Sequence, residues 1–392
     1  MQRCGRTALL MLAAAGLIAA APKAKSVPLP PYAPAYEPRT VDERGLWGET
    51  DEFERKLRDS PLVIRDEALN AYVRRVLCTT VGEDRCKSVR IYTVQVPVPN
   101  ASMAPNGMML VHSSLLLRVR SEAELGAILG HEFAHFELRH TLNAFKHQRT
   151  VSDIASWAGV LGGLSGVNTG ALQLSLLGSI FQYSRQQEQE ADLLGLQYLG
   201  SSRYPTTAAA DVWQNFMGEK DATAVGRKQR SQQRYSAGFF ASHPTDLNRA
   251  IYLRQAAAKV GDGGDPAVAG HRDGIARQLP LFLADQIKLN DFGGSEFLLG
   301  QLAGVNGWTG DLQFARGELY RARGNPRDLV SAAQFYSEAI KLGYAAPEAR
   351  RNLGLALLRS GQATDGRSAL ADYIRMKPDA SDAKAISALL TN

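Results

Sequence analysis

Residues 130–135, Gly-His-Glu-Phe-Ala-His, carry the side chains best suited to metal chemistry. Residues four apart lie on one face of a helix, so His131 and His135 can present both imidazoles to a single ion. Neutral imidazole is a preferred ligand of zinc, and Glu132 can reach a zinc-bound water without being a ligand itself. We therefore predict a hydrolytic zinc centre in which Glu132 is the general base.

The alternative for this motif is a helix that carries two histidines and no metal. The flanking residues argue against it, because they make the helix largely apolar: Leu125, Ile128, Leu129, Phe133 and Phe136. Burying two histidines and a glutamate among such residues costs free energy unless a partner such as a metal is present.

A third ligand must come from elsewhere, and the segment 183–192 offers the best candidate. Glu188 and Asp192 are four residues apart, so they share one helical face. Glu188 can bind the metal while Asp192 accepts the free N–H of a ligand imidazole, a common arrangement around zinc. Glu190 points elsewhere on the helix, where we expect it to be solvated or paired with an arginine. From the residues alone, an ordinary charged helix face is the stronger interpretation of this segment.

Together these motifs resemble the family of His-Glu-x-x-His zinc metallopeptidases that includes HtpX, BepA and the CAAX prenyl endopeptidases. The resemblance is carried by residues 130–135 and 184–192 and covers about 50–255. Residues 100–107, Asn-Ala-Ser-Met-Ala-Pro-Asn-Gly, are similar to the soluble BepA-like branch. The resemblance implies that Glu188 is the third ligand of one zinc ion per chain.

The resemblance also implies a substrate-binding strand. In related zinc peptidases the strand before the active-site helix offers its edge to the substrate, to which it donates main-chain hydrogen bonds. The candidate residues here are Met108, Met109, Leu110 and Val111. An interior strand at these positions is the alternative.

A third segment, Ser242-His243-Pro244 followed by Arg249, is similar to a further pattern of the BepA-like branch. The resemblance implies that His243 either fills the water position and keeps the enzyme latent, or acts as a catalytic residue that stabilises the transition state. Arg249 is then expected to support the site from behind the ligands. An ordinary histidine before a turn-forming proline is the other interpretation of His243.

The pattern of residues predicts an α+β fold. Val89–Val98 is rich in β-branched and aromatic residues, which is typical of a strand, and the turn residues 105–107 separate it from a second strand at Met108–His112. We predict that residues 46–261 form a mainly helical, zincin-type metallopeptidase domain with a small sheet.

Two helices should carry the metal ligands. Ser121 and Glu124 form a capping-box motif, which predicts a helix from there through at least Arg139. A second helix is expected over Arg185–Leu199. Between them, residues 154–184 contain no charge. We favour a buried or lid-forming helical pair here over a transmembrane hairpin, because glycines divide the segment into halves that are too short to cross a bilayer.

The C-terminal third changes to helix-length pieces rich in Ala, Leu, Arg and Gly. Its last unit has the spacing of a tetratricopeptide repeat, a pattern of about 34 residues. The matching residues are Leu353, Gly354, Leu357, Gly366, Leu370, Tyr373 and Pro378. The preceding unit shows a looser version, with Gly317, Tyr320, Ala332, Tyr336 and Ala339. We predict an all-α, tetratricopeptide-like repeat domain at 262–392, with an unrelated helical bundle as the alternative, because two degenerate repeats are few for such an array.

The first residues are typical of a secretory signal peptide. Two arginines precede an apolar run, Ala8–Ala21, which ends in alanines. An uncleaved anchor is the alternative, but the run is shorter than the roughly 20 residues that cross a bilayer. We predict a cleaved signal peptide at 1–21, a proline-rich linker at 22–45 and a location in the periplasm.

In an exported chain, the pair Cys78 and Cys86 predicts a disulfide, with two reduced thiols as the alternative.

These observations predict a zinc-dependent endopeptidase of the cell envelope that hydrolyses misfolded or unassembled proteins, a substrate class that the resemblance implies. The alternative is a periplasmic chaperone or outer-membrane assembly factor with a mostly latent metal site and a repeat tail that docks clients. Polypeptides are the expected partners in both cases. Docking of the tail to outer-membrane assembly machinery and peripheral contact with a membrane stay open. The formal net charge of +6 is too small to indicate a nucleic-acid partner.

Overall fold

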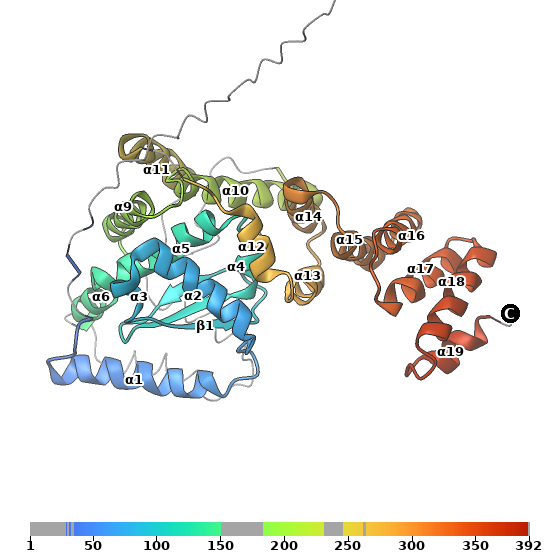
Figure 1. Cartoon of the computed structure of the whole chain (residues 1–392), viewed down its shortest axis with the longest axis horizontal. Coiled ribbons are helices and arrows are strands. Elements are labelled where there is room, and N and C mark those ends of the chain that lie inside the picture. Colours follow the sequence, from blue (N-terminus) through green and yellow to red (C-terminus); the bar gives the residue numbers. More distant parts are fainter. Residues whose placement is uncertain are drawn as a thin grey trace, which may run out of the picture.

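The structure is a computed structural model of the chain (Figure 1), and it describes residues 29, 31–32, 35–149, 183–230, 246–261 and 264–390. The predicted signal peptide at 1–21, His243 and nearly all of the uncharged segment 154–184 lie outside these residues.

Helices predominate in the described part of the chain, and three short strands form one sheet. The elements in chain order are α1 (Val41–Arg58), α2 (Glu67–Val81), α3 (Glu83–Cys86), β1 (Arg90–Val94), β2 (Ala101–Met103), β3 (Met108–His112), α4 (Ser113–Arg118), α5 (Glu122–Glu137), α6 (His140–Arg149), α9 (Arg185–Ser201), α10 (Ala208–Gly226), α11 (Asp246–Val260), α12 (Val268–Ile275), α13 (Leu279–Lys288), α14 (Phe292–Asn306), α15 (Gly310–Arg323), α16 (Pro326–Lys341), α17 (Pro347–Arg359), α18 (Ala363–Met376) and α19 (Ala383–Ala388).

Helix α1 begins at Val41, inside the segment 22–45 that the sequence predicted to be a linker. The helix begins at Val41 because Thr40 and Glu43 form a capping box there. The hydroxyl of Thr40 accepts a hydrogen bond from the Glu43 N–H, and the Glu43 carboxylate accepts one from the Thr40 N–H. The same carboxylate forms an ion pair with Lys146 of α6, which fastens α1 to the domain.

The sheet has the strand order β1-β3-β2, with β3 parallel to β1 and antiparallel to β2. The predicted strand Met108–His112 is confirmed as β3. The predicted strand Val89–Val98 is extended only over the residues of β1. The turn residues 105–107 join β3 to β2, a short strand that the sequence did not predict.

This topology corrects the prediction of the substrate strand. Met108, Met109, Leu110 and Val111 lie in the interior strand, where β1 covers one main-chain side and β2 covers the other. Their main-chain groups are therefore already used in the sheet. β1 and β2 are the two edge strands. Among the described residues, β1 is bridged on its outer side by Val63 at Val94, whereas β2 pairs only with β3 and leaves its other edge open.

The two faces of the sheet pack against different helices (Figure 1), because side chains alternate along a strand. On β3, Met108 and Leu110 lie in a hydrophobic cluster with Leu57 of α1. Met109 and Val111 point the other way, into the main core that α2 and α5 also enter. Helix α5 is thereby held against the sheet on the side opposite α1.

The main hydrophobic core continues across the boundary that the sequence predicted between residues 261 and 262. Ile275 of α12, Phe282 of α13 and Leu298 of α14 belong to the same cluster of buried side chains as α5. The helices that follow 262 are therefore packed onto the domain before the chain reaches the tail.

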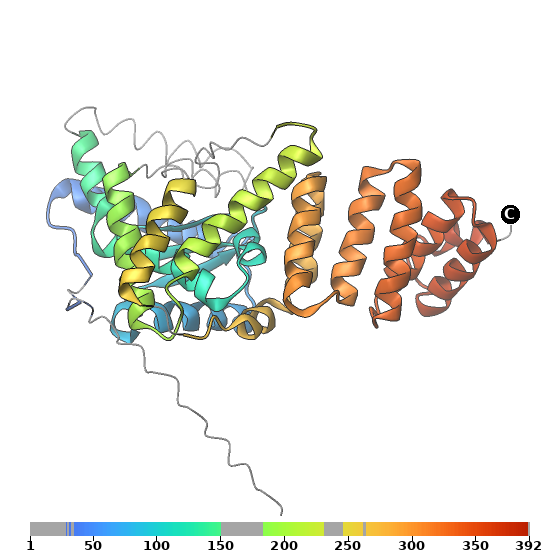
Figure 2. The ribbon, with the colours of Figure 1, turned by 90° about the horizontal axis from the view of Figure 1, so that it is seen from above.

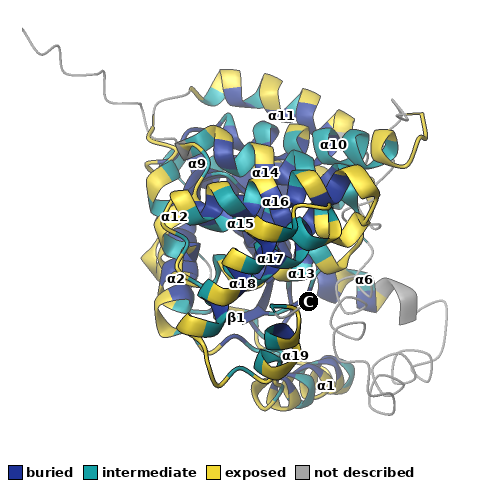
Figure 3. Ribbon diagram, turned by 90° about the vertical axis from the view of Figure 1, so that its right-hand side faces the viewer, coloured by how far each residue is buried: buried dark blue, intermediate teal, exposed yellow. Residues whose placement is uncertain are grey.

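Helices α15 to α18 form the tail, in which each helix packs against the next (Figure 2). An added Cβ at Gly317 would lie 2.5 Å from the ring of Tyr336, and one at Gly354 would lie 2.6 Å from Leu370. The small residues of the repeat pattern at 317 and 354 thus lie where neighbouring helices approach each other closely. Seen from the tail end, exposed residues lie on the outer surfaces of these helices and buried ones between them (Figure 3).

Within the described residues, none of the helices combines the length and the apolar character needed to cross a membrane.

Candidate metal centre

Helix α5 carries the first two candidate ligands and the candidate base. Its start is the predicted one, because the Ser121 side chain accepts from the Glu124 N–H. The Glu124 carboxylate accepts from the N–H of Arg120 instead of completing the box. The helix ends at Glu137, before the predicted Arg139, whose φ of 58° is incompatible with a continuing right-handed helix.

Three buried side chains converge from α5 and α9. The Nε2 atoms of His131 and His135 are 3.1 Å apart, and each faces an oxygen of Glu188, at 3.5 Å for His131 and 3.6 Å for His135. One ligand atom from each residue lies within 4.8 Å of the others. The structure therefore brings together the three residues that the sequence and the resemblance selected.

A close helix crossing allows Glu188 to reach the histidines. An added Cβ at Gly195 of α9 would lie 3.2 Å from the main-chain nitrogen of His131. Gly130 of α5 faces the same crossing, at 3.8 Å from the Gly195 carbonyl oxygen for an added Cβ. Both positions lack a side chain where the two backbones approach each other, so α9 can bring its first turn against the ligand face of α5.

Asp192 lies behind the ligands, as predicted. Its Oδ1 is 2.9 Å from Nδ1 of His131, which leaves the Nε2 of that ring directed at Glu188. Arg249 of α11 donates to both carboxylate oxygens of Asp192, and the Tyr252 hydroxyl donates to Oδ2. Although burial opposes it, the positive charge of Arg249 lowers the pKa of Asp192, with His131 adding to the effect.

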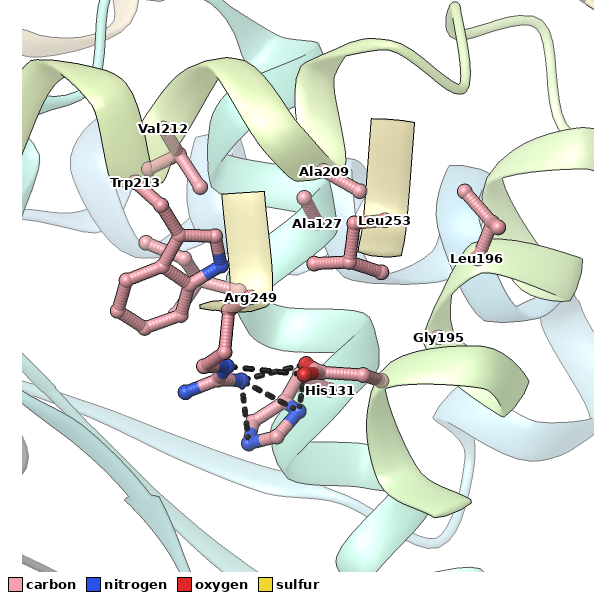
Figure 4. A pocket seen from close by; sticks show the side chains of 11 residues that line it. Ala127, His131, Gly195, Leu196, Ala209, Val212, Trp213, Arg249 and Leu253 are labelled. Carbon is pink, nitrogen blue, oxygen red and sulfur yellow. Dashed lines mark hydrogen bonds and ion pairs between the residues drawn. The ribbon is translucent and has the colours of Figure 1, made fainter. Parts of the chain in front are cut away.

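Arg249 is fully buried beside the ligands (Figure 4). Its guanidinium lies 3.8 Å from the centre of the Trp213 ring on one side and 3.2 Å from Nδ1 of His131 on the other. Its Nη1 is 3.9 Å from Oε2 of Glu188. Burial acts to lower the pKa of this guanidinium, but Asp192 raises it, so Arg249 is a permanent cation behind the metal centre.

His135 is held from the side away from Glu188 by His140, which the sequence placed one turn beyond the motif as a possible support for the site, and by Tyr183, which the sequence did not single out. The ring of Tyr183 stacks on it, with centroids 3.8 Å apart and planes 16° apart. His140 Nδ1 lies 2.9 Å from His135 Nδ1. Glu190 is exposed, as expected for a solvated residue, and it faces His140 and accepts from the Gln186 amide. The rotation of α9 places Glu190 beside His140.

Glu132 is buried next to the first ligand. Its Oε1 has no hydrogen-bond partner among the described residues. Burial raises the pKa of Glu132 to about 8 and that of Glu188 to about 9 in the protein alone. Two carboxyl groups and two imidazoles are costly to bury in this way, and a divalent cation among them would favour their ionised and ligating forms. The donor set of two imidazole nitrogens and a carboxylate oxygen fits zinc.

Two further predictions from the sequence concern the cysteine pair and His243. Cys78 and Cys86 form the predicted disulfide, with Cα atoms 5.1 Å apart. His243 lies outside the described residues, so its role as a latent ligand or transition-state donor stays a prediction.

Two histidines and a glutamate that converge from two helices, next to a second glutamate, are the side chains expected at the metal centre of a metallopeptidase. The comparison with protein families agrees, because residues 63–257 match the model of peptidase family M48. This region of the chain belongs to peptidase family M48, a family of metallopeptidases.

Several curated relatives match the same region. The mitochondrial metalloendopeptidase OMA1 of Schizosaccharomyces pombe is 30% identical over 184 residues, which are 45% of this chain and 50% of that protein. A beta-barrel assembly-enhancing protease of Yersinia pestis is 30% identical over 193 residues, 45% of this chain and 38% of the relative. The Escherichia coli K12 protein of the same name is 27% identical over 171 residues, 40% and 34% of the two chains. The matches span half or less of each of these relatives.

Proposed function

We propose that the chain is a zinc-dependent endopeptidase, with one zinc bound by His131, His135 and Glu188. The observation that carries the proposal is the convergence of these three buried side chains beside Glu132, a carboxyl group that is not needed as a ligand. A catalytic zinc site usually has three protein ligands and keeps one further position for water or substrate.

The residues divide the work of peptide hydrolysis as follows. A zinc ion bound at this centre supplies Lewis-acid polarisation of the scissile carbonyl and lowers the pKa of the attacking water. Glu132 accepts the proton of that water and then donates it to the departing amine. Asp192 holds the His131 ring so that Nε2 faces the ligand cluster. Arg249 neutralises the charge of Asp192 behind the ligands.

The open edge of β2 is the proposed place for the substrate backbone. His112 N–H donates to Asn100 C=O and Ala104 N–H donates to Met108 C=O, so residues 100 and 104 face β3. The N–H and C=O groups of successive residues point to opposite sides of a strand. Ala101 and Met103 therefore direct their N–H and C=O groups to the open edge of β2. Met103 of β2 and His135 line the same small cavity, which supports a position of this edge near the proposed metal centre. A peptide can add to it by main-chain hydrogen bonds without a strict sequence requirement.

The biological setting that we propose is the bacterial periplasm, with misfolded or unassembled envelope proteins as substrates. Support comes from the signal-peptide pattern in the sequence, the Cys78–Cys86 disulfide, which suits an oxidising compartment, and the relatives named for beta-barrel assembly. Engagement of outer-membrane assembly machinery by the tail belongs to the same proposal.

A docking role for the tail, alongside hydrolysis, is favoured by its packing. We propose that α15 to α18 are a tetratricopeptide-like array, because consecutive helices pack through the small residues Gly317 and Gly354. A cavity of about 560 Å³ opens between α13 and α15 and is lined by both apolar and charged side chains, among them Ile287, Phe314 and Tyr344. Its size is in the range of ligand pockets.

Hydrolysis of an unfolded protein such as casein tests the enzymatic proposal. The wild type should cleave it, and Glu132→Gln should reduce the rate by at least about a hundredfold while zinc content is unchanged, because the lost group is the base and not a ligand. Equal rates for both proteins would reject Glu132 as the base. Stable binding of casein without cleavage by the wild type would favour the chaperone alternative.

A further inference from the structure

His140 lies directly behind the metal ligand His135. Its Nδ1 is 2.9 Å from the Nδ1 of His135, and its Nε2 is 3.3 Å from Oε2 of Glu190 on α9. His140 is buried, with 3% of its side chain exposed, whereas the Glu190 side chain is 46% exposed. The line of contacts thus runs from the metal centre to the surface of the protein.

Two facing ring nitrogens form a hydrogen bond only when one of them carries a proton and the other does not. In one arrangement His140 carries the proton on Nδ1. Its Nε2 lone pair then faces the carboxylate of Glu190, which is repulsive. In that arrangement His135 carries its own proton on Nε2, the atom that faces Glu188, and has no lone pair to offer a metal.

The opposite arrangement satisfies both contacts of His140, the one with His135 and the one with Glu190. His135 carries its proton on Nδ1 and donates it to Nδ1 of His140. His140 then carries its own proton on Nε2 and donates it to Glu190. The lone pair of His135 remains on Nε2, directed at the cluster that contains Glu188. The carboxylate of Glu190 is the group that favours this arrangement, because it faces an N–H and not a lone pair.

The plane of the His135 ring is fixed separately. The Tyr183 ring covers one face of it, and the Tyr183 hydroxyl lies 2.8 Å from Oγ1 of Thr141 on α6. Stacking restrains the tilt of the imidazole, while the contact with His140 restrains its rotation and its tautomer. Both restraints lower the cost of placing Nε2 in a ligand position.

We propose that His140 is a positioning residue for the metal. With Glu190 it selects the tautomer of His135 that carries its proton on Nδ1, and Nε2 is thereby free to bind the cation beside Glu188. This inference rests on the metal centre of the proposed function, and it adds the residues that make the second histidine of the motif a competent ligand.

Zinc affinity of the full chain, measured by competition with a chelator, tests the proposal. His140→Phe keeps a ring of similar size without an acceptor, and it should weaken zinc binding by roughly 10- to 100-fold. His140→Asn places an oxygen near the position of Nδ1 and should recover most of the affinity. Asn143→Ala, at an exposed position of the same helix, is the control and should bind zinc as the wild type does.

The tautomer itself is read from the ¹⁵N chemical shifts of His135 in the metal-free protein. The wild type should carry the proton on Nδ1, and Glu190→Ala should shift the population toward the Nε2–H form. Gln189→Ala, an exposed neighbour on α9, should leave it unchanged.

Wild-type affinity in His140→Phe, equal losses in the Phe and Asn variants, or a proton on Nε2 of His135 in the wild type would each overturn the inference. A wild type that binds no zinc would instead reject the proposed function, and the ¹⁵N measurement would still decide whether His140 and Glu190 select the tautomer.

Discussion

Oδ1 of Asp192 lies 2.9 Å from Nδ1 of His131, and the same carboxylate accepts two hydrogen bonds from Arg249. One buried side chain therefore joins the ligand helix α5 to α9 and α11. Removing its charge should affect both the metal centre and the stability of the fold.

We expect Asp192→Asn to weaken zinc binding by roughly 10- to 100-fold, because His131 loses the acceptor that orients it. The substitution also removes the carboxylate that is hydrogen-bonded to the buried charge of Arg249, which should lower the free energy of unfolding by about 3–5 kcal/mol. Chelator competition and urea unfolding measure the two effects. Asp211→Asn removes the exposed ion pair with Arg254 and is the matched control, with a loss of less than about 1 kcal/mol. Similar results for both variants would contradict the bridging role.

The crossing of α5 and α9 should not tolerate a larger residue at Gly195. A valine there must push the helices apart, because even its Cβ would lie 3.2 Å from the main chain of His131. We expect Gly195→Val to lower the free energy of unfolding by about 1–3 kcal/mol and to weaken zinc binding by displacing Glu188. Gly48→Val in α1 is the control, since an added Cβ there meets nothing within 4 Å. Unchanged affinity and stability in Gly195→Val would show that the close crossing does not position Glu188.

His271 of α12 should make the stability of the protein depend on pH. Its Nδ1 accepts from the Tyr72 hydroxyl, at 2.6 Å, and its Nε2–H donates to the Leu116 carbonyl oxygen, at 3.0 Å. Burial lowers the pKa of His271 from 6.5 to about 4. Between these two pH values the ring is therefore neutral in the folded protein and protonated in the unfolded chain. Stability contributed by the neutral ring is present above pH 6.5 and is lost as the pH falls toward 4, by up to about 3 kcal/mol.

His271→Gln provides the comparison, because an amide can keep both hydrogen bonds but does not titrate. Urea unfolding between pH 7.5 and 4.5 should show a smaller loss of stability for the variant than for the wild type. His112, whose pKa burial also lowers to about 4, is present in both proteins and cancels in the difference. Parallel curves for the two proteins would be inconsistent with a neutral, buried His271.

The continuity of the core past residue 261 predicts how truncation acts. A chain that ends at Gly261 lacks Ile275, Phe282 and Leu298, each of which contributes about 1.5–3 kcal/mol by its burial. It should therefore unfold at a clearly lower temperature than the full chain. A chain that ends at Gly343 keeps these side chains together with α15 and α16, and its unfolding temperature should stay close to that of the full chain. Equal unfolding temperatures for the two truncated chains would support a domain boundary between residues 261 and 262, as the sequence predicted.

The local features of the site were predictable from the sequence, and the long-range ones were not. The spacing of His131 and His135 fixes their common helix face, and the strand Met108–His112 was located by its composition. Its neighbours in the sheet depend on pairing between distant segments, so its interior position escaped prediction. Glu188 was selected only through the resemblance, because the residues alone favoured a charged surface.

Contacts behind the ligands were the hardest to foresee. Glu190 lies at the surface, as expected, but its contact with His140 was not predicted, because that contact depends on the rotation of α9. Tyr183 stands two residues before α9, and nothing in its neighbours along the chain indicates that its ring stacks on His135. Such contacts follow from how two helices meet, which the periodicity of each helix does not determine.

The metal content of the purified protein tests the central claim most directly. We expect elemental analysis to find about one zinc per chain in the wild type and almost none in His131→Ala or Glu188→Ala, because each variant removes one of three ligands. Asn143→Ala should retain the wild-type content. A wild type without a transition metal, or the same zinc content in all four proteins, would contradict the assignment of His131, His135 and Glu188 as the metal centre.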